Sequence, residues 1–236
     1  MLTSIRNLNL PYDEERYINE LCHKLQSLVG DNLVGVYLLG SASQSCYVKG
    51  ESDLDIQMVV AQELTEQNKI DVSQALRHDN FPCPATKLEF VTYTKYGLSS
   101  PELLQYSINL NTGKTIADYV SFDYTSDPRH WFVLDIAMAE KYGINLVGQP
   151  FSAVFPNIDQ NLLLDVMQEC LNWFVSYFPG EACYHCACRI LYYLEKGELV
   201  SKRDALDYIK SSEKLIAIEQ QQLVDWVLVR LKTYVR

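Results

Sequence analysis

Two aspartates one residue apart, Asp53 and Asp55, are the residues of this chain best suited to chemistry. They follow the pair Gly40 and Ser41 after a short polar loop, and apolar residues alternate with them. Side chains two positions apart in a strand point to the same face, so both carboxylates lie together while the apolar side chains face the core. Neighbouring carboxylates repel each other, and a divalent cation relieves that repulsion. The pattern indicates a site for a metal ion and phosphate groups.

A third carboxylate, that of Glu89, belongs to a strand expected over residues 87–93. If this strand lies beside the one that carries the aspartates, Glu89 reaches the same place. Three acids on neighbouring strands can bind one or two Mg²⁺ ions that bridge the phosphates of a nucleotide. Two such ions, roughly 3.5–4 Å apart, stabilise the attacking and the leaving oxygen of an in-line displacement. Beside them, the Gly40 backbone allows close approach of a phosphate, and Ser41 can donate its amide and hydroxyl.

The first part of the chain contains the elements that must position these residues. Apolar residues recur at helical spacing over residues 13–29, and Thr65 is suited to cap a second helix that runs through Arg77. Apolar runs predict three short strands, over residues 33–39, 53–60 and 87–93. The following stretch, Gly97 to Thr125, is polar and irregular, and we interpret it as part linker and part wall of a cleft.

From residue 127 onward the chain changes to helical patterns. Helices are expected over residues 128–142, 158–177, 183–196, 202–211 and 212–235. Gly143 and Gly197 stand where helices end, and Ser201 stands where a helix begins. We therefore expect an α+β protein with two domains. Residues 1–125 form a small mixed sheet flanked by helices, and residues 126–236 form an α-helical bundle.

Composition limits the class of protein and of ligand. The chain has 236 residues, 48% of them hydrophobic and 21% charged, which is enough for one large or two modest globular domains. Its formal net charge of −10 disfavours a nucleic acid as partner, because phosphate polymers bind basic surfaces. Cationic small molecules would be attracted instead, although an acidic surplus can also serve solubility alone.

Hydropathy and cysteine spacing bear on the compartment. The chain has neither an apolar run of about 18 residues nor a basic-then-apolar start, so we expect a cytoplasmic protein without membrane contact. The seven cysteines are odd in number and irregularly spaced, which predicts free thiols. The cluster over residues 183–188 lacks a second ligand pair, so we expect its cysteines to pack in a helix rather than to bind zinc.

Several motifs resemble one enzyme superfamily. Gly40-Ser41, Asp53-x-Asp55 and Glu89 together resemble the nucleotidyltransferases of the DNA polymerase β type. The helical half narrows this resemblance to the aminoglycoside adenylyltransferases of the streptomycin and spectinomycin type, over residues 29–208. The segments that carry it are Asp127-Pro128, Tyr142 to Pro150, Cys188-Arg189-Ile190-Leu191-Tyr192, Gly197 and Ser201-Lys202. The resemblance implies a nucleotidyltransferase catalytic domain over 1–125 and a helical substrate-binding domain over 126–236.

The resemblance also implies a reaction and the residues that perform it. A hydroxyl of the antibiotic would attack the α-phosphate of ATP, so that AMP is transferred and pyrophosphate leaves. The implied roles are these: Gly40 and Ser41 hold the triphosphate, Asp53, Asp55 and Glu89 bind Mg²⁺, Glu89 also takes the proton from the hydroxyl, and Arg189 and Lys202 contact the nucleotide phosphates.

Three residues of the helical half are candidates for contact with the antibiotic. Glu181 could bind a cationic amine or guanidinium, and Trp131 and Trp173 could form platforms for sugar rings. Each has an ordinary interpretation as well, since exposed glutamates are common and tryptophans on apolar helix faces usually pack in cores. Similarly, Arg189 could pair with a surface acid, and Lys202 could be solvated.

Two other functions remain open from the residues alone. One is a nucleotidyltransferase that acts on a protein or on another small metabolite. The other is a non-catalytic nucleotide-binding homologue, in which the long loop over residues 42–52 no longer aligns phosphates. For the aminoglycoside adenylyltransferase we expect ATP and a cationic aminoglycoside as partners, and a monomer or weak dimer.

Overall fold

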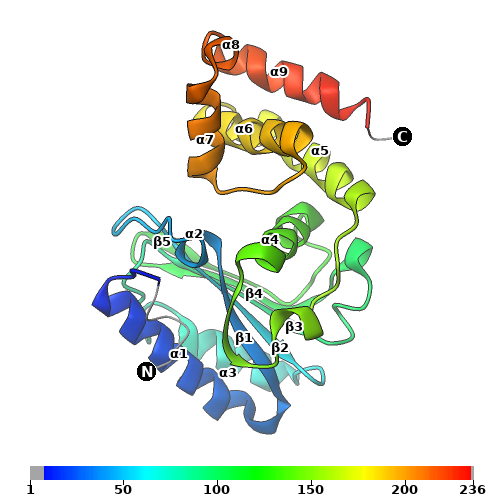
Figure 1. Cartoon of the computed structure of the whole chain (residues 1–236). Helices are drawn as coiled ribbons and strands as arrows, with labels where there is room; N and C mark the ends of the chain where they lie inside the picture. The colour runs from blue at the N-terminus through cyan, green and yellow to red at the C-terminus, as the bar shows by residue number, and fades with distance from the viewer. Residues whose placement is uncertain (1–7, 235–236) are drawn as a thin grey trace. The chain divides into compact units, whose positions relative to one another are not determined.

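The computed structural model describes residues 8–234 of the chain, shown in Figure 1. The chain forms two compact units. The first comprises the residues up to Pro128 together with Ala139–Asn157, and the second comprises Arg129–Met138 and the residues from Ile158 onward. Helix α4 (Arg129–Tyr142) therefore contributes to both units.

The first unit is built on one mixed sheet of six strands. Its strand order is β5-β4-β3-β2-β1-β6, and only β2 and β3 are parallel to each other. The strands are β1 (Leu33–Leu39), β2 (Leu54–Val60), β3 (Leu88–Thr94), β4 (Tyr106–Gly113), β5 (Ile116–Ser121) and β6 (Ile144–Gly148). Together with the helices of the second unit, this sheet confirms the predicted α+β class.

Two helices cover one face of the sheet. Helices α1 (Tyr12–Val29) and α3 (Glu66–Leu76) lie side by side there, as Figure 1 shows. The Thr65 side chain accepts a hydrogen bond from the Asn68 amide, as expected of an N-cap. On the opposite face of the sheet, the Tyr37 ring of β1 packs edge-on against Phe151 and Phe155 at centroid distances of 5.8 and 5.0 Å. Because both faces are covered, β1 is a nearly continuous apolar run.

Two predictions about the strands were wrong. The stretch expected to be irregular, Gly97 to Thr125, contains the hairpin of β4 and β5. Residues of β4 do alternate between apolar and polar side chains, but the polar ones, Ser107 and Asn109, are buried and bonded to Glu63 and Asp127, which hid the strand. Strand β6, which pairs antiparallel with β1, lies between the helices expected over residues 128–142 and 158–177, in the part expected to form a purely helical bundle.

The second unit is helical, as predicted. Besides residues of α4 it contains α5 (Gln160–Tyr177), α6 (Glu181–Lys196), α7 (Lys202–Ser211), α8 (Glu213–Ile216) and α9 (Gln220–Leu231). Asp159 and Ser201 cap α5 and α7 with their side chains. The single helix expected over residues 212–235 is interrupted after α8, where a tight hydrogen bond from the Ile218 amide to Leu215 ends the helix. Val235, its expected end, lies outside the described residues. None of the described helices has the length and hydropathy needed to cross a bilayer.

Candidate functional site

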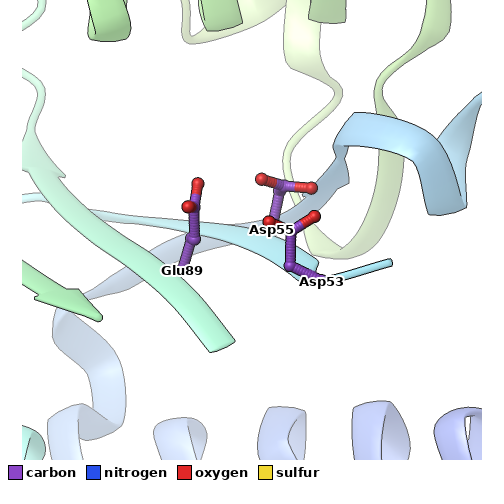
Figure 2. Close-up of side chains that lie close together, drawn as sticks. All are labelled: Asp53, Asp55 and Glu89. Carbon is purple, nitrogen blue, oxygen red and sulfur yellow. The ribbon is translucent and has the colours of Figure 1, made fainter. Parts of the chain in front are cut away.

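Three carboxylates converge at one end of the sheet. Asp55 lies opposite Glu89 in the parallel register of β2 and β3, and Asp53 directly precedes β2. One oxygen of each lies within 4.8 Å of the others, and Figure 2 shows the three side chains on the same face of the sheet. The alternation of a strand produces this arrangement, because Leu54, between the aspartates, is fully buried. The structure thus brings together the three acids expected to bind metal.

The electrostatics of this cluster disfavour three bare carboxylates. Burial raises the pKa of Asp53, and the charge of Glu89 raises it further. Lys87 acts in the opposite direction: its ammonium lies 3.6 Å from Asp53 Oδ2 and donates a hydrogen bond to Glu89 Oε1. The donor set, three carboxylates that supply oxygen ligands around one point, fits Mg²⁺.

Lys87 is the residue of this cluster that the sequence reasoning missed. It stands two positions before Glu89, so the same alternation that grouped the aspartates places both side chains on one face. An ammonium cannot coordinate a metal ion, so a lysine does not belong to the pattern of a metal site. The spacing of two positions between Lys87 and Glu89 was nevertheless sufficient to predict that both side chains lie on the same face.

The pair Gly40 and Ser41 forms the corner that follows β1. Gly40 has φ of +62°, and a Cβ built there would overlap the Asp55 carboxylate. This position therefore requires glycine for its backbone conformation and for the space that Asp55 occupies. The Ser41 Oγ is buried and has no hydrogen-bond partner among residues 8–234. This buried, unpaired hydroxyl directly follows Gly40 in the chain, and a phosphate oxygen fits as its missing partner.

The long loop over residues 42–52 is fastened to α1. The Tyr47 hydroxyl donates a hydrogen bond of 2.9 Å to Glu14 Oε1, and Glu14 is completely buried. Burial raises the pKa of Tyr47, and the Glu14 carboxylate raises it further, so the phenol remains a donor at neutral pH. This contact connects the loop between Ser41 and Asp53 to the helical layer.

We expect Tyr47→Phe to destabilise the protein by about 1–3 kcal/mol, because a buried carboxylate loses a hydrogen-bond donor. The measurement is the free energy of unfolding in urea. Tyr12→Phe is the matched control, since Tyr12 is 67% exposed and lies on α1, the helix that also carries Glu14. Equal stability of the two variants would show that the Tyr47–Glu14 contact does not hold the loop.

The second unit contains a pocket of about 260 Å³. Arg189 and Lys202 line it, and neither has an ion-pair partner in the described part of the chain. The contact of Arg189 and Lys202 with nucleotide phosphates stays a prediction. The other lining residues are mainly apolar, aromatic or thiol-bearing: Trp131, Leu134, Asp135, Met167, Cys170, Phe174, Ala182, His185, Cys186, Ile190 and Leu199. Unpaired cations in an apolar wall favour an anionic ligand with an apolar part.

Both tryptophans belong to an aromatic cluster in this unit. Trp131 and Trp173 pack edge to face at 5.0 Å, and Trp173 also stacks on Phe178 at 5.0 Å. Both tryptophans are half-buried, so they pack with neighbours and also retain accessible surface. Glu181 begins α6 with its side chain 82% exposed, and its carboxylate lies 3.6 Å from His185 Nε2. Their contact with a substrate stays a prediction.

The chain is similar in structure to spectinomycin adenyltransferase AAD(9) from Enterococcus faecialis, solved with ATP and spectinomycin. The match covers 92% of this chain and 99% of that chain, with a TM-score of 0.68 and 16% sequence identity. A toxin-antitoxin solved with AMP-PNP matches 65% of this chain and 90% of its own, with a TM-score of 0.29 and 16% identity. No protein-family model matches the sequence, and no curated protein matches it. The chain thus has the nucleotidyltransferase fold that its motifs predicted.

Proposed function

We propose that this protein is an adenylyltransferase that transfers AMP from ATP to a hydroxyl of an aminoglycoside antibiotic, streptomycin or spectinomycin. The observation that carries the proposal is the convergence of Asp53, Asp55 and Glu89 within 4.8 Å in a nucleotidyltransferase fold. The similar adenyltransferase was solved with ATP and spectinomycin, which supports the same pair of co-substrates here.

The carboxylates supply the chemistry in this proposal. Asp53, Asp55 and Glu89 hold Mg²⁺, which when bound neutralises charge on the phosphates of ATP and stabilises the in-line displacement. Glu89 would also accept the proton of the attacking hydroxyl. A bond forms between the hydroxyl oxygen of the antibiotic and the α-phosphorus, the bond from the α-phosphorus to the bridging β-phosphate oxygen breaks, and pyrophosphate leaves.

The remaining residues position the two substrates. Ser41 donates its buried hydroxyl to a phosphate oxygen beside Gly40. Arg189 and Lys202, which have no ion-pair partner among the described residues, bind further phosphate oxygens. Glu181 is exposed and anionic, as a contact for a cationic antibiotic must be, and the surface of Trp131 and Trp173 supports a sugar ring. The net charge of −10 attracts such cations.

The test is pyrophosphate release by the purified protein with ATP and Mg²⁺. We expect release only when streptomycin, spectinomycin or a related drug is added, and a mass increase of the drug by one AMP group. Chelation of the metal is expected to stop the reaction. Release that needs no drug would favour a nucleotidyltransferase with another acceptor. Nucleotide binding without any release would favour the non-catalytic homologue.

A further inference from the structure

Lys87 lies inside the carboxylate cluster but has no part in the proposed reaction. Its Nζ bonds to Glu89 Oε1 and lies 3.6 Å from Asp53 Oδ2, so it contacts two of the three acids. Its side chain is 31% exposed, close to the 34% and 35% of the two acids. Burial lowers the pKa of Lys87, but Glu89, Asp53 and Asp55 raise it by more, so the net direction is upward and the ammonium stays charged.

An ammonium and a divalent cation cannot both make their best contacts here. The three carboxylate oxygens converge within 4.8 Å, and an ammonium donates hydrogen bonds to oxygens that a metal would coordinate. Two positive charges so close also repel each other. A metal that binds Glu89 must therefore displace Lys87 from that oxygen or bind against its charge.

We propose that Lys87 is a built-in counter-ion, which holds Asp53 and Glu89 together without metal and leaves Glu89 when a divalent cation binds. The inference rests on the metal-binding part of the proposed function and not on the identity of the acceptor. Its consequence is a protein that stays folded without metal and binds the free ion weakly. Once displaced, the ammonium remains beside the site, where its compact charge suits a phosphate oxygen.

A purely structural role of Lys87 and a counter-ion role predict opposite changes in metal affinity when Lys87 is removed. If Lys87 only braces the two strand ends, its removal would let the acids separate, and metal affinity would fall. If Lys87 instead acts as counter-ion, its removal leaves a stronger anionic site, and metal affinity rises. The sign of the change in metal affinity therefore separates the two roles.

The experiment is calorimetric titration of the metal-free full chain with Mn²⁺, without nucleotide. We expect Lys87→Met to bind Mn²⁺ about tenfold more tightly than wild type. Lys87→Gln, which keeps a polar side chain, is expected to do the same and serves if the methionine variant does not fold. Lys87→Arg keeps the charge and should not tighten binding. Lys95→Met controls for net charge, because Lys95 is exposed just beyond the far end of β3. The Mn²⁺ affinity of this variant should equal that of wild type.

Thermal unfolding supplies a second readout. Without metal, Lys87→Met is expected to melt below wild type, because Asp53 and Glu89 lose their counter-ion, and Mn²⁺ should raise its melting temperature more than that of wild type. Equal or weaker Mn²⁺ binding by both neutral variants, equal tightening by Lys87→Arg, or no binding by any variant would overturn the proposal. Failure to adenylylate a drug would not affect these measurements, so the two proposals can fail separately.

Discussion

Asp55→Asn is expected to lower the rate of drug-dependent pyrophosphate release by about 10³-fold or more, which corresponds to roughly 4 kcal/mol of transition-state stabilisation. Asp55 lies between Glu89 and the corner formed by Gly40 and Ser41. It faces Glu89 across the parallel pair, and its carboxylate lies against Gly40. An asparagine keeps the size of the side chain but removes its charge, so the metal loses an anionic ligand.

Steady-state release of pyrophosphate measures this effect, and Mn²⁺ titration locates its cause. Asp79→Asn is the matched control, because Asp79 is exposed in the same unit and the substitution is chemically identical. We expect the control to retain the wild-type rate. Undiminished release by Asp55→Asn, in a variant with wild-type melting behaviour, would show that the carboxylate cluster does not bind the catalytic metal.

The carboxylate cluster was predictable because it depends on local rules. The alternation of a strand orders Asp53, Leu54 and Asp55, and a parallel pairing of β2 with β3 is enough to add Glu89. The same rule places Lys87 on the face of Glu89, but the sequence reasoning missed it, and its role depends on a contact with Asp53 that no single strand reveals. Chemistry that follows from one element can be predicted, whereas a counter-ion is a property of the assembled sheet.

The strands that were missed have a different cause. In β4 the polar residues that suggested a loop are buried and bonded to side chains distant in sequence, such as Ser107 to Glu63. Strand β6 has only five residues, and its antiparallel partner β1 lies more than a hundred positions earlier. Short strands are specified by their neighbours more than by their own composition. Their pairing was therefore beyond a reading of local pattern.

The helical unit was predictable in its helices but not in its pocket. Caps and periodicity located α5, α6 and α7, because these signals lie within each helix. The pocket gathers residues from α4, α5, α6 and the start of α7. Only the packing of these segments brings Arg189 and Lys202 to one wall without ion-pair partners in the described residues. The resemblance pointed to both cations, and the packing of the helices explains why they line the same pocket.

Gly40→Ala is expected to lower both Mn²⁺ affinity and the rate of release by about 10²-fold or more. Alanine in the left-handed region costs roughly 1–2 kcal/mol by itself, and Gly40 has φ of +62°. The larger effect is steric, since the added Cβ would lie 2.5 Å from Asp55 Cγ and overlap the carboxylate. Either Asp55 turns away from the metal position or the corner that carries Ser41 moves. Both outcomes separate the metal ligands from the phosphate contact.

Gly30→Ala separates backbone strain from this steric effect. Gly30 lies in the same unit with φ of +53°, and a Cβ there would meet nothing within 4 Å. The control variant therefore also places alanine at a positive φ but leaves Asp55 in place, and we expect it to lose stability without losing Mn²⁺ affinity. If both alanine variants lose affinity equally, strain alone is responsible. If neither does, the corner tolerates movement, and contact between Gly40 and Asp55 does not organise the site.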